Sequence, residues 1–527
     1  MIKYFVSYYK PIMESCFHRF VAALLFITTS TVTIAQSLPD AAMNQDIPAV
    51  RQLLSEGANP DAKGQFDTPA IHWLVRLDDI ESTRLLLNAG ADPNITSKYG
   101  VTPLGLAVQS GNPAMIDLLL QLGADANTRE HSGETLLMSA SEVGVLESVV
   151  LLADAGAEID ARDRHFDQTA LMFATRAGHY EIASFLLDQG ANPNARTAIG
   201  DTPNWTAPNS QRGFGFGIGI IRGGTPADRG RREPIPGGMT PLLYSARHDH
   251  VDIVEMLLDN GADIHLTDAN NINALLMAVE NNSMASARLF IERGSDINEV
   301  DWYGRTPLWE AINVRNLYTH NDLFENYINN REEILGLITL LVNKGADVNA
   351  RNTESPPIRQ NLLSITGTLE WVDFTGQTPF LRAARAGDMD VMQLLLANGA
   401  DPHLQTFAGT NALMAAAGIN WVFSQTWTES PEQLLAAVQL CIDLGMDVNH
   451  TNSMGLAAIH GAANRGSNDI INLLVQNDAK LDLLDNENRS PLVWANGVFL
   501  ATHPAEAKPE SMALITSLLE DRNMPIR

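Results

Sequence analysis

Hydrophobic positions occur along this chain in pairs of short segments, from about residue 40 to the C-terminus. In the clearest example, residues 376–388, a Gly-Gln-Thr-Pro turn leads into the segment Phe380-Leu381-Arg382-Ala383-Ala384, whose apolar positions have helical spacing. A second apolar segment contains Leu394-Leu395-Leu396 and is followed by Gly399. The pattern predicts two short helices per unit, each unit opened by a turn and closed by glycine.

The closing glycine recurs at nearly constant spacing. It falls at Gly57, Gly90, Gly123, Gly156, Gly190, Gly261, Gly294, Gly345, Gly399 and Gly445, and Asp478 takes the same place near the end. The basic step is 33 residues, and four steps are longer because they contain insertions. A fixed period of this length predicts a stack of repeats.

The residue types suit that architecture. Threonine before the first helix can accept hydrogen bonds from free N–H groups, and proline fits the first helical turn. Glycine supplies the left-handed residue after the second helix. Asn273, Asn411 and Ala457 replace the capping threonine in three units. We expect weaker caps there, at about 1 kcal/mol each.

The period and motif resemble the ankyrin repeat family. The best copies are Thr102-Pro103-Leu104, Thr240-Pro241-Leu242, Thr306-Pro307-Leu308 and Thr378-Pro379-Phe380. The resemblance is to exported, signal-peptide-bearing bacterial members with aromatic-rich insertions. It implies an all-α fold, a curved solenoid of about 12 helix-turn-helix repeats with β-turn fingers and four insertions.

This interpretation divides the chain into parts. They are a signal peptide at 1–35, repeats one to five at 36–196, a Gly/Pro/Arg-rich insertion at 197–237, and repeats six to twelve at 238–527, with insertions near 314–331, 351–372 and 419–431.

The N-terminus has the composition of a secretory signal. Basic residues precede an eight-residue apolar run at 20–27, and small residues before Gln36 predict cleavage after Ala35. The run is short for a membrane helix, although an uncleaved anchor and a start at Met13 are alternatives. We therefore expect a periplasmic or secreted protein with no stable membrane span after cleavage. Cys441 is alone in the mature chain, which excludes an intramolecular disulfide there.

Net charge and the absence of certain motifs disfavour several classes of function. A net charge of −27 disfavours nucleic acid as a partner. The sequence lacks a zinc-binding His-Glu-x-x-His helix, a phosphate loop and a Gly-x-Ser-x-Gly elbow. The glycine run 213–219 alternates with apolar residues, which is typical of an extended ribbon rather than a dinucleotide fingerprint. We predict no enzyme activity, no cofactor and no metal site.

A binding surface is the better candidate. The resemblance implies that partners dock on the concave face, made of turn tips and the exposed side of each first helix. Carried over position by position, and with two insertion tryptophans added, it selects Trp302, Tyr303, Arg305, Glu310, Phe374, Gln377, Arg382, Arg385, Phe407, Trp421, Trp427, Arg247 and Arg176. Tryptophan and arginine are enriched at interface hot spots.

We therefore predict a non-catalytic, monomeric scaffold that docks a protein partner, with the groove over repeats eight to ten as its site. The alternative is a small-molecule or glycan-binding protein with a pocket under the aromatic insertions, near Trp421, Trp427 and Tyr318. The aromatic residues in the insertions could equally have a structural role, in which they pack the loops against the helices.

Overall fold

The computed structural model of the chain describes residues 36–130, 132–200, 237–316, 330–354, 372–421, 429–498 and 505–526. The predicted signal peptide and most of the four insertions lie outside these residues. Within them every regular element is a helix, and strand-like pairing is limited to isolated bridges at Lys63–Pro69 and Arg129–Thr135. The all-α prediction is confirmed.

The helices of the described residues form twelve pairs, the number that the repeat spacing predicts. The first helices are α2 (Leu38–Met43), α4 (Ala70–Arg76), α6 (Pro103–Gln109), α8 (Leu136–Val143), α10 (Ala170–Ala177), α12 (Pro241–Arg247), α14 (Ala274–Glu280), α16 (Pro307–Arg315), α19 (Pro379–Ala386), α21 (Ala412–Ala417), α23 (Ala458–Arg465) and α25 (Pro491–Ala495). The second helices are α3 (Ile47–Ser55), α5 (Ile80–Asn88), α7 (Pro113–Gln121), α9 (Leu146–Asp154), α11 (Tyr180–Asp188), α13 (Val251–Asp259), α15 (Met284–Glu292), α18 (Arg331–Asn343), α20 (Met389–Ala397), α22 (Pro431–Asp443), α24 (Asn468–Gln476) and α26 (Pro509–Asp521). A 3₁₀ turn, η1 (Gln65–Asp67), precedes α4.

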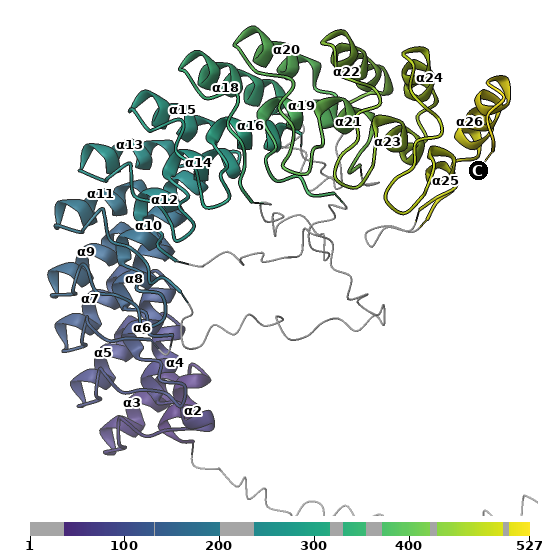
Figure 1. Ribbon diagram of the computed structural model, residues 1–527. Coiled ribbons are helices and arrows are strands. Elements are labelled where there is room, and N and C mark those ends of the chain that lie inside the picture. The colour runs from purple at the N-terminus through teal and green to yellow at the C-terminus, as the bar shows by residue number, and fades with distance from the viewer. Residues whose placement is uncertain are drawn as a thin grey trace, which may run out of the picture. The chain divides into compact units, whose positions relative to one another are not determined.

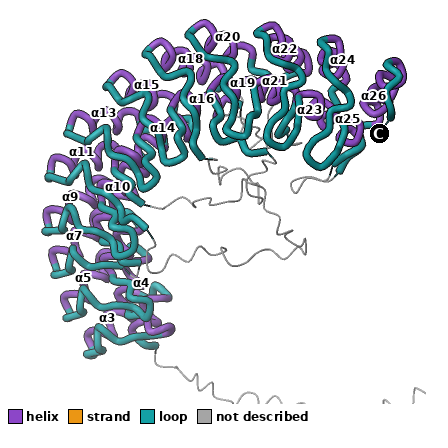
Figure 2. The backbone as a smooth tube through the Cα atoms, viewed as in Figure 1, coloured by secondary structure: helices purple, strands orange, loops and turns teal. Residues whose placement is uncertain are grey.

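The chain divides into two compact units, Met1–Ala157 and Glu158–Arg527. Within each unit, first helices pack on neighbouring first helices and second helices on neighbouring second helices, which gives two layers (Figure 1). The connections from one repeat to the next form the tips, and the tube trace shows them as loops beside the first helices (Figure 2). Each repeat therefore buries its apolar face mainly against its sequence neighbours.

Insertions lengthen the sequence without interrupting the stack. In the second unit α10 packs against α12 although residues 197–237 separate their repeats in the sequence. In the same way α16 packs against both α18 and α19, across the second and third insertions. The core thus continues where the sequence period breaks.

The predicted glycine position is confirmed in every repeat that carries it. All ten glycines have φ between 84° and 97°, and Asp478 has φ 65° in the same place. A Cβ at Gly90 or Gly399 would meet nothing within 4 Å, so the backbone conformation alone favours glycine there. This left-handed residue ends each second helix and turns the chain into the next tip.

The expectation of weak caps is wrong for two of the three departures. Asn273 and Asn411 accept hydrogen bonds from the N–H groups of Leu276 and Met414 at 2.8 and 2.9 Å. Asparagine caps helices at least as well as threonine, which explains the result. Ala457 has no capping side chain, although His460 Nδ1 accepts from the Ala457 N–H at 3.0 Å.

A ladder of asparagine side chains, which the sequence analysis missed, links successive repeats. Asn94 Nδ2 donates to the carbonyl of Gly123 at 2.9 Å, and its Oδ1 accepts from Asp125 N–H at 2.8 Å. Asn349 makes the same two bonds to Gly399 and Asp401. The recurring Gly-Ala-Asp-x-Asn sequence is the signal that predicts it, because its asparagine can satisfy one carbonyl and one N–H of the next repeat.

Candidate binding surface

Six of the predicted partner-binding residues are buried rather than presented. They are Tyr303, Arg305, Glu310, Phe374, Gln377 and Arg382, each between 1% and 6% exposed. Their assignment to an open groove over repeats eight to ten is therefore wrong. The physical reason is that neighbouring tips and first helices bring these positions against one another.

Arg305 shows how a tip side chain is used inside the protein. Its Nε donates to Asp301 Oδ2 at 2.7 Å, and its Nη1 to Glu310 Oε2 at 3.1 Å. Glu280 of the preceding repeat lies 3.6 Å away. Carboxylates offset the cost of burying an arginine, and the ion cluster links the tip before α16 to α16 and α14.

Arg382 of repeat nine is likewise hydrogen-bonded inside the protein. Its Nε donates to Asn313 Oδ1 at 2.9 Å, and its Nη2 to the carbonyl of Asn316 at 2.9 Å. Arg315 donates to Asp388 Oδ2 at 2.9 Å, and Asn316 Nδ2 donates to the same oxygen. The polar side chains that looked available for a partner instead join α16 to α19.

Aromatic side chains at the tips fall into two groups. Tyr303 and Phe374 pack inside, and Arg305 and Arg385 stack on their rings at 5.6 and 5.1 Å. Other tip aromatics are exposed: Phe66 and Tyr99 in the first unit, and Phe166 and Phe407 in the second, at 66%, 67%, 43% and 61%. Phe407 was predicted, whereas the other three exposed aromatics were not among the residues selected from sequence.

The remaining predicted residues divide by exposure. Trp302, Arg385, Trp421 and Arg176 are half-buried, Arg247 is exposed, and Trp427 lies outside the described residues. Tyr318 lies outside them too, so the alternative pocket under the insertions stays a prediction.

A basic cluster lies on repeats five and six, formed by Arg176, Tyr244, Arg247, His248 and His250. The two imidazole rings stack with centroids 5.9 Å apart, and His250 Nε2 lies 3.4 Å from the carbonyl oxygen of Arg176. Burial first, and then the charges of Arg247, His250 and Arg176, lower the pKa of His248. These effects show that the cationic groups lie close enough to act on one another.

Hydrogen bonds hold two side chains in and beside this basic cluster, Tyr244 and Asp249. The Tyr244 hydroxyl accepts from Gln168 Nε2 at 2.8 Å, and burial raises its pKa. The Asp249 carboxylate also lies here, and its Oδ1 accepts from the N–H of Ser286 at 2.8 Å. Arg247 forms no ion pair among the described residues. The cluster therefore presents positive charge on a protein that is strongly acidic as a whole.

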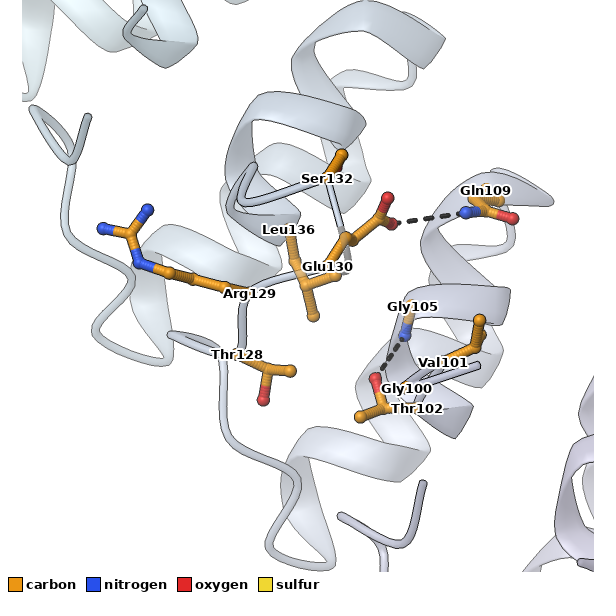
Figure 3. A pocket seen from close by; sticks show the side chains of 10 residues that line it. All are labelled: Gly100, Val101, Thr102, Gly105, Gln109, Thr128, Arg129, Glu130, Ser132 and Leu136. Atoms are coloured by element: carbon orange, nitrogen blue, oxygen red, sulfur yellow. Dashed lines mark hydrogen bonds between the residues drawn. The ribbon is translucent and has the colours of Figure 1, made fainter. Parts of the chain in front are cut away.

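In the first unit, a cavity of about 130 Å³ lies between repeats three and four. It is lined by Gly105 and Gln109 of α6 and by residues of the next tip, and Figure 3 shows Gln109 reaching across it to Glu130. Ligand pockets for small molecules are usually about 300–1,000 Å³. We infer that this space is a packing gap, left where Gly105 has no side chain.

His72 and His460 occupy the position of Gly105 in other repeats. Their Nε2 atoms contact the carbonyl oxygens of Val101 and Leu483 in the following repeats, at 2.8 and 3.2 Å. Burial lowers the pKa of both imidazoles, which suits neutral, structural side chains.

Two further features are absent from the described residues. No three His, Cys, Asp or Glu side chains are placed there to hold a metal ion. None of the described helices has the length and apolar composition needed to cross a membrane.

The geometry defines a repeat solenoid whose units stack mainly on their sequence neighbours. The sequence matches the family model "Ankyrin repeats (3 copies)" over residues 38–130, 123–197 and 242–352, and the model "Ankyrin repeat" over residues 375–407. These matches span more than half of the chain, which belongs to the ankyrin repeat family. Ankyrin repeats generally mediate protein–protein interaction and are generally non-catalytic.

The chain is similar to parts of several curated proteins. The chain is 26% identical over 169 residues to YahD of Escherichia coli, which covers 31% of this chain and 81% of that protein. It is 25% identical over 181 residues to the ankyrin repeat protein nuc-2 of Neurospora crassa, and 27% over 186 residues to the palmitoyltransferase AKR1 of Lachancea kluyveri. These matches cover 32% and 34% of this chain, but only 15% and 20% of those proteins.

Solved structures include the ankyrin repeat domain of Bcl-3, a member of the IkappaB family. It has 24% sequence identity and a TM-score of 0.38, and the match covers 49% of this chain and 97% of that domain.

Proposed function

We propose that this protein is a non-catalytic scaffold of an exported compartment, which docks a protein partner through its turn tips and first helices. The observation that carries the proposal is the basic cluster of repeats five and six. Its site differs from the groove predicted from sequence, because most of that groove's side chains are used inside the protein.

The cluster combines features of an interaction hot spot. Arginine and tyrosine are enriched there, and charge raises the rate at which a complementary partner associates. Arg176 and Arg247 come from adjacent first helices, α10 and α12, so a rigid stack sets their separation. Phe166, at the tip before α10, adds exposed apolar surface to the same repeats.

Charge complementarity indicates the kind of partner. An acidic segment would meet local positive charge there, whereas the rest of the surface would repel it. Because the scaffold is already ordered, little conformational entropy is lost from it when the partner docks.

The test is affinity capture from the exporting cell followed by mass spectrometry, with the double variant Arg247→Ala/His248→Ala beside the wild-type protein. Arg84→Ala is the matched control, because Arg84 is exposed on the second helix α5. We expect a specific partner that the double variant loses and the control retains, and that binds less well as salt rises. Equal recovery by all three proteins would show that the cluster is not the docking site.

Export has its own test. Cell fractionation should place the protein in the periplasm or the medium, and N-terminal sequencing should find Gln36 as the first residue. A protein found in the cytoplasm with residues 1–35 still attached would refute this part of the proposal.

A further inference from the structure

A half-buried arginine lies between repeats ten and eleven, and no described carboxylate forms an ion pair with it. The guanidinium of Arg465, at the end of α23, donates from Nη1 to the carbonyl of Ala416 in α21 at 3.1 Å. Its Nε and Nη2 are buried and have no hydrogen-bond partner among the described residues. The backbones of these helices approach closely, since a Cβ at Gly418 would lie 2.7 Å from the carbonyl oxygen of Gly461.

A second cation lies nearby in repeat nine. Arg385 Nη2 donates to the carbonyl of Asn420 at 3.2 Å, and its guanidinium lies 5.1 Å from the centre of the Phe374 ring. Burial first, and then the charge of Arg385, lower the pKa of Arg465 to about 9. Arg465 is therefore still charged at neutral pH, and the described carboxylates form no ion pair with it.

Two buried arginines of this protein are compensated by carboxylates. Arg305 lies 2.7 Å from Asp301, and Arg315 lies 2.9 Å from Asp388. A guanidinium that is covered from water and lacks a counterion is costly, so Arg465 differs from Arg305 and Arg315 in this respect.

The unused edge of Arg465 has a defined chemistry. Nε–H and Nη2–H lie side by side on a guanidinium and point the same way, which matches the two oxygens of a carboxylate. The third nitrogen, Nη1, is already occupied by Ala416. The half-buried Trp421 ring lies 5.5 Å from the guanidinium.

We propose that Arg465, with Arg385 beside it, receives a carboxylate group between repeats nine and eleven. The group binds the Nε/Nη2 edge of Arg465 through both of its oxygens, and Arg385 adds a second positive charge. The carboxylate belongs either to a small free acid or to an acidic side chain of a protein, and both present the same chemistry to this edge. The site is separate from the basic cluster and does not depend on docking there.

The experiment is isothermal titration calorimetry of the purified protein with sodium malonate at constant ionic strength, and with sodium sulfate and a pentaglutamate peptide in parallel. We expect saturable binding of malonate, of the peptide or of both, and none of sulfate at equal concentration. Tighter binding of the peptide would assign the carboxylate to a protein segment, and tighter binding of malonate to a free acid. Either result supports the proposal.

Variants decide whether the site is the one described. Arg465→Gln should abolish the saturable binding, and Arg465→Lys should weaken it roughly tenfold or more, the effect of losing one hydrogen bond to a charged group. Arg351→Gln is the matched control, since Arg351 also lies over an aromatic ring, that of Phe407, and donates to the carbonyl of Gly376. Saturable binding that survives in both Arg465 variants, equal binding of sulfate, or no saturable binding at all would overturn the proposal.

The docking proposal and this one fail separately. Arg247→Ala/His248→Ala should leave malonate binding unchanged, because those residues belong to the basic cluster.

Discussion

Replacing glycine with alanine should have opposite effects on stability at two positions in first helices, Gly105 and Gly461. A Cβ at Gly105 in α6 would lie 3.3 Å from Thr102 Oγ1 and 3.6 Å from Leu136 Cδ2, beside the 130 Å³ cavity. A Cβ at Gly461 in α23 would lie 2.6 Å from the backbone nitrogen of Ile419. At Gly105 the Thr102 side chain would have to move by a few tenths of an ångström, whereas at Gly461 the obstacle is backbone.

The magnitudes follow from this difference. Glycine within a helix is less stable than alanine by roughly 0.5–1 kcal/mol, so Gly105→Ala should stabilise repeats three and four by about that amount. At Gly461 the same gain is outweighed, because forcing a methyl group against backbone costs roughly 1–3 kcal/mol.

Hydrogen exchange measured by mass spectrometry is the suitable assay, because a long repeat array need not unfold in one step. Peptides covering α6 should exchange roughly two- to fivefold more slowly in Gly105→Ala, since 1.4 kcal/mol corresponds to tenfold. Peptides covering α23 should exchange faster in Gly461→Ala. If both variants shifted exchange in the same direction, the cavity would not be a packing gap of the kind inferred here.

Three other changes test the core and its charges. Asp478→Gly should stabilise repeat eleven by about 1 kcal/mol, because it removes the strain of a non-glycine residue at φ 65°. Thermal melting measures this gain, and an unchanged melting temperature would show that the strain is absent. Arg305→Met should destabilise by about 3–5 kcal/mol in chemical denaturation, since Asp301 and Glu310 would be left buried and unpaired, and a loss below 1 kcal/mol would contradict the ion cluster. Burial lowers the pKa of His460 in the folded protein to about 4, whereas the pKa of an unfolded histidine is near 6.5. The neutral imidazole therefore contributes fully to the free energy of unfolding above pH 6.5, and this contribution falls as the pH drops towards 4. At pH 5 the loss should be about 2 kcal/mol, and His460→Gln should remove that part of the pH dependence.

The failure of the predicted groove has a particular cause. The transfer of binding positions from the family assumed that positions four and seven after the cap face solvent in every repeat. Asn313 and Arg382 show otherwise, because position seven of one first helix lies against position four of the next and the two side chains bond at 2.9 Å. Where the side chain is short or its neighbour lacks a partner group, as at Arg247, the same position stays exposed.

The sequence by itself determined the repeats. The glycine spacing, the capping residues and the paired apolar segments each depend on backbone geometry within one repeat, and that geometry is nearly the same wherever the motif occurs. For this reason the twelve helix pairs and the left-handed turn at Asp478 could be predicted from residue order alone.

Only the tertiary structure decided which polar side chains are available. Arg305 pairs with Asp301 and Glu310, and Arg382 bonds to Asn313 of the preceding repeat, whereas two guanidinium nitrogens of Arg465 have no partner among the described residues. Burial and pairing depend on contacts between side chains that are far apart in the sequence, and the short-range pattern that specifies each helix holds no information about them.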